Sequence, residues 1–336
     1  MRCYQFIFKL LKHTNKGFST KYLISLFPLE TASTTATKSA VKTTTTSASS
    51  ITPCINSTWN QNGIVVAGTG LSYPLDVAID SKQNLYIVDY FNNRIQKFDA
   101  NNSNPPATLL STSGLQNIVI DKFDNVYFTV NYAVMMFNVT TGNITIVAGN
   151  GLQGSDLNQL HFPEGFYVDQ NLTVYVSDTE NNRVMKWYKD ATQGILVAGN
   201  GKASNSSFSL FNPFGIFVDE INEKGAMYIC DNMNNRIQKY LPGAIAGITV
   251  ATPFNPWVIL LDANGIMYIC QSHYNQIIKW IPGSVVGEII VGGSIAALSL
   301  PWGIKFDTNY NLYVADQSNN RVVKFLYQPL SCPSSG

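Results

Sequence analysis

Histidine and cysteine are scarce in this chain of 336 residues, which contains 3 histidines and 5 cysteines. Zinc in proteins is held by imidazole nitrogens or by thiolates, often with the cysteines in Cys-x-x-Cys pairs. No such pair occurs here, and the histidines stand at unrelated places in the sequence: His13, His161 and His273. We therefore expect neither a zinc site built from histidines nor a small zinc domain built from cysteines.

Charge is also scarce, because only 13% of the residues are charged and the formal net charge is +1. Proteins that bind nucleic acid through its phosphates show a basic excess or a basic stripe, and no basic run follows residue 54. Long apolar runs are missing too, since no stretch reaches the roughly 20 residues that span a bilayer. We expect no nucleic-acid partner and no membrane-spanning segment.

The N-terminal part of the chain differs in composition from the remainder. Residues 1–30 are basic until Glu30 and contain only short apolar patches, which Lys9 interrupts. A secretory leader needs an unbroken apolar run of about 7 to 15 residues. This segment is therefore either a degraded or mis-started leader or a basic amphipathic helix, and the helix would direct the protein to an organelle or a membrane surface. Membrane association is expected only through this segment, if at all.

Residues 31–53 consist almost wholly of Thr, Ser and Ala. Such a segment buries too little apolar surface to offset the entropy lost on ordering. The composition predicts a disordered stalk whose hydroxyl groups are acceptors for O-linked sugar.

From residue 54 to residue 332 one phrase recurs at intervals of about 40 to 50 residues. It consists of Pro, an apolar run, Asp, a short gap, Tyr-x-x-Asp and then Asn-Asn-Arg-apolar-x-Lys-aromatic, as in residues 74–98, 163–187 and 301–325. In all six units the first apolar run ends at an aspartate: Asp80, Asp121, Asp169, Asp219, Asp262 and Asp307. Repeats of this length that contain several short strands are typical of propeller blades. The sequence predicts an all-β, six-bladed β-propeller.

The two ends of the repeat region predict how the ring closes. Most units contain a fourth strand, but the last unit has none after Phe325, and an unattached strand, residues 63–67, precedes the first unit. We expect this N-terminal strand to complete the sixth blade beside Val323, which leaves no open sheet edge there.

Two cysteines, Cys54 and Cys332, stand just outside the predicted ring. Closure would bring them near each other, and we expect a disulfide between them, which persists only in an oxidising compartment. The alternative is two unrelated surface thiols.

Three segments, residues 86–98, 175–187 and 313–325, strongly resemble NHL repeats, and the resemblance extends over residues 62–326. The resemblance implies a six-bladed propeller but not one function. Members of that family include enzymes that cleave amidated-peptide precursors with a central zinc, ubiquitin ligases, RNA binders and extracellular recognition modules. The scarcity of histidine and cysteine departs from the first two types.

Four of the six units pair an aspartate with an arginine five residues later: Asp89 and Arg94, Asp178 and Arg183, Asp231 and Arg236, and Asp316 and Arg321. The second unit has Val130 and Met135 at these positions, and the fifth has Gln271 and Gln276. Acid and base are thus lost together, which predicts a structural ion pair, because removal of one partner would leave a buried charge. The alternative is a ring of arginines that recognises an anion.

Polar and aromatic residues share the end of the predicted ring where the inner strands begin. The first three units offer Asp76, Asn117 and Glu164, whose oxygen atoms are of the type that calcium binds, although Glu164 is one residue out of alignment with the other two. The other three units place Phe214, Trp257 and Trp302 at the same end. Together with Glu164, these three could form a ligand site, and the alternative is simple packing between inner strands.

We favour a non-catalytic recognition module without a cofactor, a monomeric propeller that binds a protein, peptide or glycan ligand. The stalk and the predicted disulfide place it outside the cell or at the cell surface. The alternative is a calcium-dependent propeller hydrolase of small esters or lactones, which would use Asp76, Asn117 and Glu164.

Overall fold

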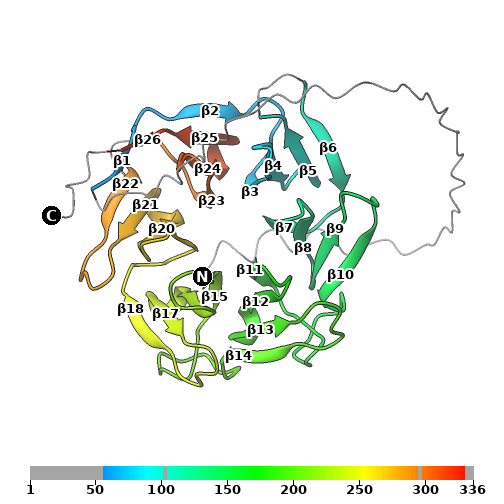
Figure 1. Ribbon diagram of the computed structural model, residues 1–336, viewed down its shortest axis with the longest axis vertical. Helices are drawn as coiled ribbons and strands as arrows, with labels where there is room; N and C mark the ends of the chain where they lie inside the picture. The colour runs from blue at the N-terminus through cyan, green and yellow to red at the C-terminus, as the bar shows by residue number, and fades with distance from the viewer. Residues whose placement is uncertain (1–55, 101–103, 294–296, 330–336) are drawn as a thin grey trace, which may run out of the picture. The chain divides into compact units, whose positions relative to one another are not determined.

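The computed structural model describes residues 56–100, 104–293 and 297–329. These residues form six four-stranded antiparallel sheets arranged around a central axis, with the first strand of each repeat innermost (Figure 1). The prediction of an all-β, six-bladed propeller is confirmed. Among the described residues no helix is long and apolar enough to cross a membrane.

The four strands of each blade follow one another from the axis outwards. Blade 1 contains β3 (Pro74–Ile79), β4 (Leu85–Asp89), β5 (Arg94–Phe98) and β6 (Ala107–Ser111). Blade 2 contains β7 (Leu115–Ile120), β8 (Val126–Val130), β9 (Ala133–Phe137) and β10 (Ile144–Gly149). Blade 3 contains β11 (Pro163–Val168), β12 (Val174–Asp178), β13 (Arg183–Trp187) and β14 (Ile195–Gly199).

The second half of the ring repeats this order. Blade 4 contains β15 (Pro213–Asp219), β16 (Ala226–Asp231), β17 (Arg236–Tyr240) and β18 (Ile248–Ala251). Blade 5 contains β19 (Val258–Leu261), β20 (Met267–Gln271), β21 (Gln276–Trp280) and β22 (Glu288–Gly292). Blade 6 contains β23 (Pro301–Phe306), β24 (Leu312–Asp316), β25 (Arg321–Phe325) and β2 (Ile64–Ala67). Short 3-10 helices follow the second strand in blades 3 to 6: η1 (Thr179–Asn181), η2 (Asn232–Asn234), η3 (Ser272–Tyr274) and η4 (Gln317–Asn319).

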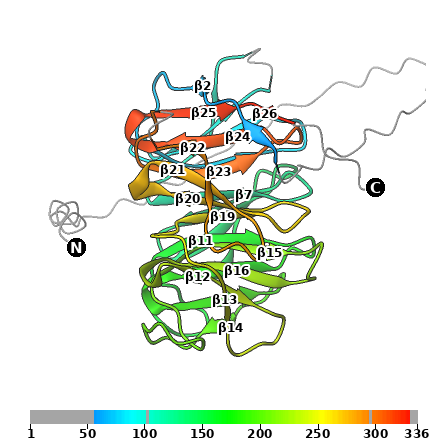
Figure 2. The same ribbon diagram turned by 90° about the vertical axis from the view of Figure 1, so that its left-hand side faces the viewer.

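The N-terminal strand β2 closes the ring as the outer strand of the sixth blade. It runs antiparallel to β25 with Val65 opposite Val323, and the two strands lie side by side in Figures 1 and 2. The predicted closure is therefore confirmed. A further pair, β1 (Thr58–Trp59) and β26 (Tyr327–Gln328), joins the two ends of the described chain. Cys54 and Cys332 both lie outside the described residues, so their predicted disulfide stays a prediction.

The aspartate that follows each inner strand holds the turn into the second strand. In blade 1 the Asp80 carboxylate accepts hydrogen bonds from the backbone N–H groups of Lys82 and Asn84, at 2.9 and 2.8 Å, and from the Tyr86 hydroxyl at 3.1 Å. An aspartate that bonds backbone amides in this way fixes a turn.

The Asp–Arg pairs of the repeat attach the loop that enters each blade. In each of the four blades, arginine Nε donates to the aspartate Oδ2 over 2.7 Å, in the pairs Asp89–Arg94, Asp178–Arg183, Asp231–Arg236 and Asp316–Arg321. In blade 4 the other carboxylate oxygen accepts from the backbone N–H of Phe211, and Arg236 Nη2 donates to the carbonyl of Ser206. Each arginine is therefore bound within its own blade.

A hydrogen bond to the second asparagine of the Asn-Asn motif, or to its equivalent, links neighbouring blades, and the sequence did not predict it. Asn182, Asn235, Asn275 and Asn320 each end a 3-10 helix in a left-handed conformation, which asparagine tolerates. Their side-chain oxygens accept from the backbone N–H that precedes the next inner strand, over 2.7 to 3.0 Å, in Asn212, Asn255, Leu300 and Tyr73 respectively. The contact from Asn320 to Tyr73 joins blade 6 to blade 1.

Candidate active site at the central axis

Three predicted polar residues lie on adjacent inner strands, β3, β7 and β11. The Asp76 Oδ2 atom accepts a hydrogen bond of 3.0 Å from the backbone N–H of Ile118 in the next blade. Asn117 Nδ2 in turn donates to the backbone carbonyl of Glu164, also over 3.0 Å. The structure thus brings Asp76, Asn117 and Glu164 together along one side of the axis, and we call these three residues the axial site.

Asp76 occupies space that a glycine leaves open in the neighbouring blade. A Cβ atom added at Gly303 would lie 2.0 Å from Asp76 Oδ1. That same oxygen accepts from the backbone N–H of Val77 at 2.8 Å. Burial raises the pKa of Asp76 to about 7, although the N–H groups of Ile118 and Val77 and the charge of Lys305 oppose the shift.

Glu164 is held differently, because its carboxyl group makes no hydrogen bond or ion pair with any residue that the structure describes. Burial raises the pKa of Glu164 to about 7, and the negative charge of Glu180 in η1 adds to the increase. A carboxyl group in this state is near half-ionised at neutral pH. It can therefore accept or release a proton there.

Lys305 on the innermost strand β23 is a further ionisable residue near Asp76, and it was not among the site residues expected from the sequence. Burial lowers the pKa of Lys305, while the Asp76 carboxylate favours the charged amine. The sequence did contain a signal, since the same position of the other inner strands holds only uncharged residues: Ala78, Val119, Tyr167, Phe217 and Leu260. Lys305 is thus the one amine at this position of the six inner strands.

The aromatic residues predicted at the opposite side of the axis form one continuous cluster. The ring centroids of Phe214 and Trp257 lie 4.5 Å apart, and those of Trp257 and Trp302 lie 4.3 Å apart. Trp257 is only 4% exposed, and its Nε1 donates to Asn255 Oδ1 over 2.7 Å. Trp257 is thus mainly a packing residue, whereas Phe214 and Trp302 are partly exposed and can contact a ligand.

The chemistry of the axial site suits a hard cation better than zinc. Calcium takes carboxylate and amide oxygens, and the side chains of Asp76, Asn117 and Glu164 supply two carboxylates and one amide. Within the described part of the chain no three His, Cys, Asp or Glu residues gather into a metal-binding group. A cation held here therefore depends on the Asn117 oxygen and on water or backbone carbonyls to complete its coordination.

Comparison with known proteins agrees with the repeats found in the sequence. Residues 71–98 and 160–187 match the family model of the NHL repeat. The resemblance to NHL repeats is thereby confirmed at these two units, and the six-bladed propeller is consistent with it. No curated protein matches this sequence.

Solved structures with a similar fold include several enzymes. A streptogramin B lyase is 15% identical, with a TM-score of 0.57, over 81% of this chain and 98% of that chain. Virginiamycin B lyase from Staphylococcus aureus is 16% identical, with a TM-score of 0.56, over 80% of this chain and 99% of that chain. A gluconolactonase from Xanthomonas campestris is 12% identical, with a TM-score of 0.61, over 82% of this chain and 97% of that chain. At these identities the likeness establishes the fold and not the reaction.

These enzymes nevertheless correct the prediction of a non-catalytic propeller. That prediction depended on the absence of a histidine cluster and on the lack of an assembled catalytic set. Enzymes of the same fold are among the structures similar to this chain, and a histidine cluster is only one way to build an active site. Nor could the partial burial of Asp76 and Glu164 be seen in the sequence, because it depends on neighbouring blades.

Proposed function

We propose that this NHL-type propeller is a hydrolase of small esters or lactones, with its active site at Asp76, Asn117 and Glu164 and with calcium as its cation. The observation that carries the proposal is the Glu164 carboxyl group, which lies on an innermost strand without a compensating partner among the described residues. An unpaired carboxyl group in such a place destabilises the fold when it ionises. A functional role explains why it is there better than packing does.

In the proposed reaction the Glu164 carboxylate acts as the general base. The ionised carboxylate takes a proton from a water molecule as the water oxygen bonds to the ester carbonyl carbon. The bond from that carbon to the alkoxy oxygen then breaks, and Glu164 returns the proton to the departing oxygen. Atoms and charge balance, because one water is consumed and one acid and one alcohol are formed.

The other residues of the axis bind and orient the substrate. Hydrogen bonds from Val77 and Ile118 fix the Asp76 carboxylate, so that its oxygens keep one orientation. A calcium ion bound to the axial site would polarise the carbonyl group of the substrate. Phe214 and Trp302 offer apolar surface for the carbon skeleton of the substrate and exclude water from it.

The choice of lactones among possible esters is supported by one of the similar structures, which is a gluconolactonase. The sequence indicated Asp76, Asn117 and Glu164 as the residues of the alternative function, a calcium-dependent hydrolase. Their placement on adjacent inner strands supports that function. The predicted location outside the cell remains part of this proposal, since calcium would be available there.

The proposal is tested with the purified chain, a panel of small lactones and aryl esters, and calcium. We expect calcium to raise the melting temperature and to increase hydrolysis, and Glu164→Gln to abolish both effects. Glu180→Gln is the matched control, because Glu180 is an exposed carboxylate next to Glu164. This control should keep its activity, with the acidic limb of its pH profile moved to slightly lower pH. Full activity in Glu164→Gln, or no hydrolysis of any substrate by the wild type, contradicts the proposal.

A further inference from the structure

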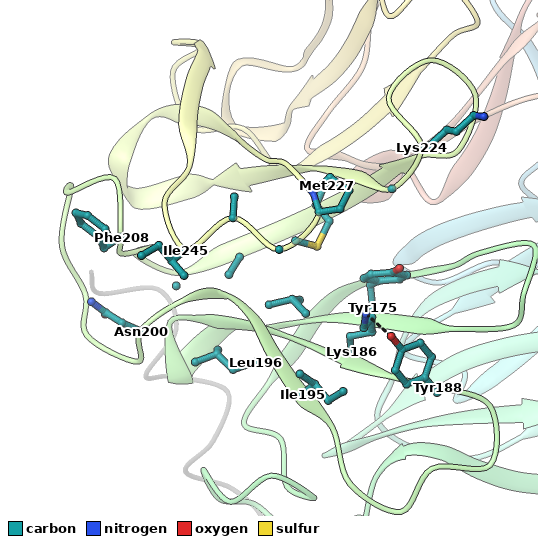
Figure 3. Close-up of a pocket in the computed structure, with 17 residues that line it drawn as sticks. Tyr175, Lys186, Tyr188, Ile195, Leu196, Asn200, Phe208, Lys224, Met227 and Ile245 are labelled. Carbon is teal, nitrogen blue, oxygen red and sulfur yellow. Dashed lines mark hydrogen bonds between the residues drawn. The ribbon is translucent and has the colours of Figure 1, made fainter.

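A groove of about 810 Å³ lies between blades 3 and 4, and strand β14, the outermost strand of blade 3, forms one side of it (Figure 3). Its surface is mostly apolar and includes Leu196, Val197 and Ala198 of β14 together with Met227 of β16. Phe208 and Ile245 stand at one end, where they are 51% and 81% exposed. Large apolar side chains gathered in the open in this way mark a binding surface.

The other end of the groove carries Lys186, whose position in the repeat makes it unusual. The same position holds a lysine in four other blades, and each of those lysines has an acidic partner, in the pairs Lys97–Asp80, Lys239–Glu223, Lys279–Glu288 and Lys324–Asp307. Within the described residues Lys186 has no carboxylate within the 4.0 Å of an ion pair. Lys186 is therefore the one lysine of this set that forms no ion pair within the described residues.

Two tyrosines hold the Lys186 amine at the groove. Lys186 Nζ donates to the Tyr188 hydroxyl over 2.9 Å and lies 4.5 Å from the centre of that ring and 5.9 Å from the ring of Tyr175. Figure 3 shows all three side chains at the end of the groove opposite Phe208. An ammonium group that is fixed by neutral hydroxyl and ring partners keeps its charge for an external anion.

No Asp or Glu lines the groove, and its second lysine, Lys224, points away from Lys186 in Figure 3. The groove thus has an apolar body with one cationic end. Its volume falls within the range of about 300 to 1,000 Å³ that small-molecule sites occupy.

We propose that this groove binds a small amphipathic carboxylate, with the carboxylate on Lys186 and Tyr188 and the hydrocarbon chain along Leu196 and Met227 toward Ile245. This site is separate from the axial site, and the two can be tested independently. Charge complementarity decides the class of ligand, because a neutral or cationic amphiphile leaves Lys186 without a counter-charge.

Isothermal titration calorimetry with decanoate tests the proposal, with decyltrimethylammonium as the cationic counterpart of equal chain length. We expect decanoate to bind and the cation not to bind, and Lys186→Met to weaken decanoate binding by about tenfold or more. Lys324→Met is the matched control, because Lys324 holds the same repeat position but is paired with Asp307 at 3.1 Å. Decanoate affinity in the control should stay within about twofold of the wild-type value.

A second variant, Ile245→Asp, keeps the proposal testable if Lys186→Met fails to fold. Ile245 is 81% exposed, so this change should leave the fold intact while it weakens decanoate binding through lost apolar contact and added negative charge. Equal decanoate affinity in the wild type, Lys186→Met and Ile245→Asp would overturn the proposal. The proposal would also be overturned if a second copy of the chain occupied the groove. In that case Ile245→Asp would change the sedimentation coefficient of the protein, and decanoate would not.

Discussion

Gln276 Nε2 donates a hydrogen bond of 2.7 Å to Gln271 Oε1 in blade 5, at the position where four other blades hold an Arg–Asp ion pair. Gln271 Nε2 also donates to the backbone carbonyl of Phe254 over 2.7 Å. A neutral pair thus performs the same attachment of the incoming loop without a buried charge. Acid and base are replaced together because either one alone would lack its partner.

This relationship predicts strong coupling between Asp231 and Arg236 in blade 4. Arg236→Gln leaves the fully buried Asp231 without its counter-charge and should lower the free energy of unfolding by about 3 kcal/mol. The double variant Asp231→Gln and Arg236→Gln reproduces the blade 5 pair and should cost less than Arg236→Gln alone. Denaturant unfolding of the wild type, both single variants and the double variant gives the coupling energy. Simple additivity of the two single effects would show that the pair is not a unit.

The raised pKa of Glu164 predicts how stability depends on pH. In the unfolded chain Glu164 ionises near its ordinary value of 4.5, whereas in the folded protein its pKa is about 7. Between these values the folded state binds more protons than the unfolded state, so the free energy of unfolding falls as the pH rises. The loss is complete about one pH unit above this folded-state pKa and amounts to about 3 kcal/mol.

Glu164→Gln should remove this contribution, so its unfolding free energy should fall less between about pH 4.5 and pH 7 than that of the wild type. Chemical denaturation at several pH values in the absence of calcium measures the difference. Asp76 contributes in the same direction, since its pKa is also raised to about 7. If the free energy of unfolding of the wild type and of Glu164→Gln changed with pH in parallel, the pKa of Glu164 would not be raised in the folded protein.

The architecture could be predicted from the sequence because each of the six repeat units shows the strand pattern of one blade. The Asp–Arg pairs, the turn aspartates and the closing strand beside Val323 all follow from aligning copies within one chain. The first two are contacts inside one blade, where sequence spacing fixes the distance, and the third follows because the last unit lacks a fourth strand.

The axial site could be predicted only in part, because it is made of contacts between blades. The positions of Asp76, Asn117 and Glu164 followed from the alignment, but the degree to which neighbouring blades cover them did not. Burial depends on how close the neighbouring inner strand comes, as at Gly303, and no local pattern reports that distance. The role of Lys305 could not be predicted for the same reason. Lys186 could not be singled out either, because it differs from the other lysines of the repeat only in forming no ion pair within the described residues.

Gly303→Ala should disturb the axial site more than an equally crowded substitution elsewhere in the ring. The added Cβ would lie 2.0 Å from Asp76 Oδ1 and 2.7 Å from its Cα, so Asp76 must move. Gly215→Ala is the control, because its Cβ would lie 2.6 Å from the Trp257 carbonyl and touches no axial residue. Both should lose about 1 to 3 kcal/mol of stability, but only Gly303→Ala should also lose the calcium-induced rise in melting temperature. Equal calcium responses in the two folded variants would separate Asp76 from cation binding.

Trp302 and Trp257 should differ in what their replacement changes. Trp302→Leu removes partly exposed aromatic surface and should raise KM for the ester substrate with little change in kcat or stability. Trp257→Leu removes a ring that is 4% exposed and contacts both Phe214 and Trp302, so it should cost about 2 to 4 kcal/mol of stability. Steady-state kinetics and thermal unfolding of both variants make the comparison. An unchanged KM in Trp302→Leu would place the substrate elsewhere.

The ends of the propeller provide a test of the predicted disulfide. Thr58 pairs with Gln328 across β1 and β26, and Cys54 and Cys332 each lie four residues beyond these positions, towards the chain ends. Protein secreted from an oxidising compartment should be lighter than its reduced form by two hydrogen atoms, and the difference should vanish in Cys54→Ser. Because the bond would close a very long loop, its loss should lower stability by at most about 5 kcal/mol. The actual loss should be smaller, since β2 and β25 already restrain both ends. Two free thiols in the secreted protein, detected by alkylation before reduction, would rule the bond out.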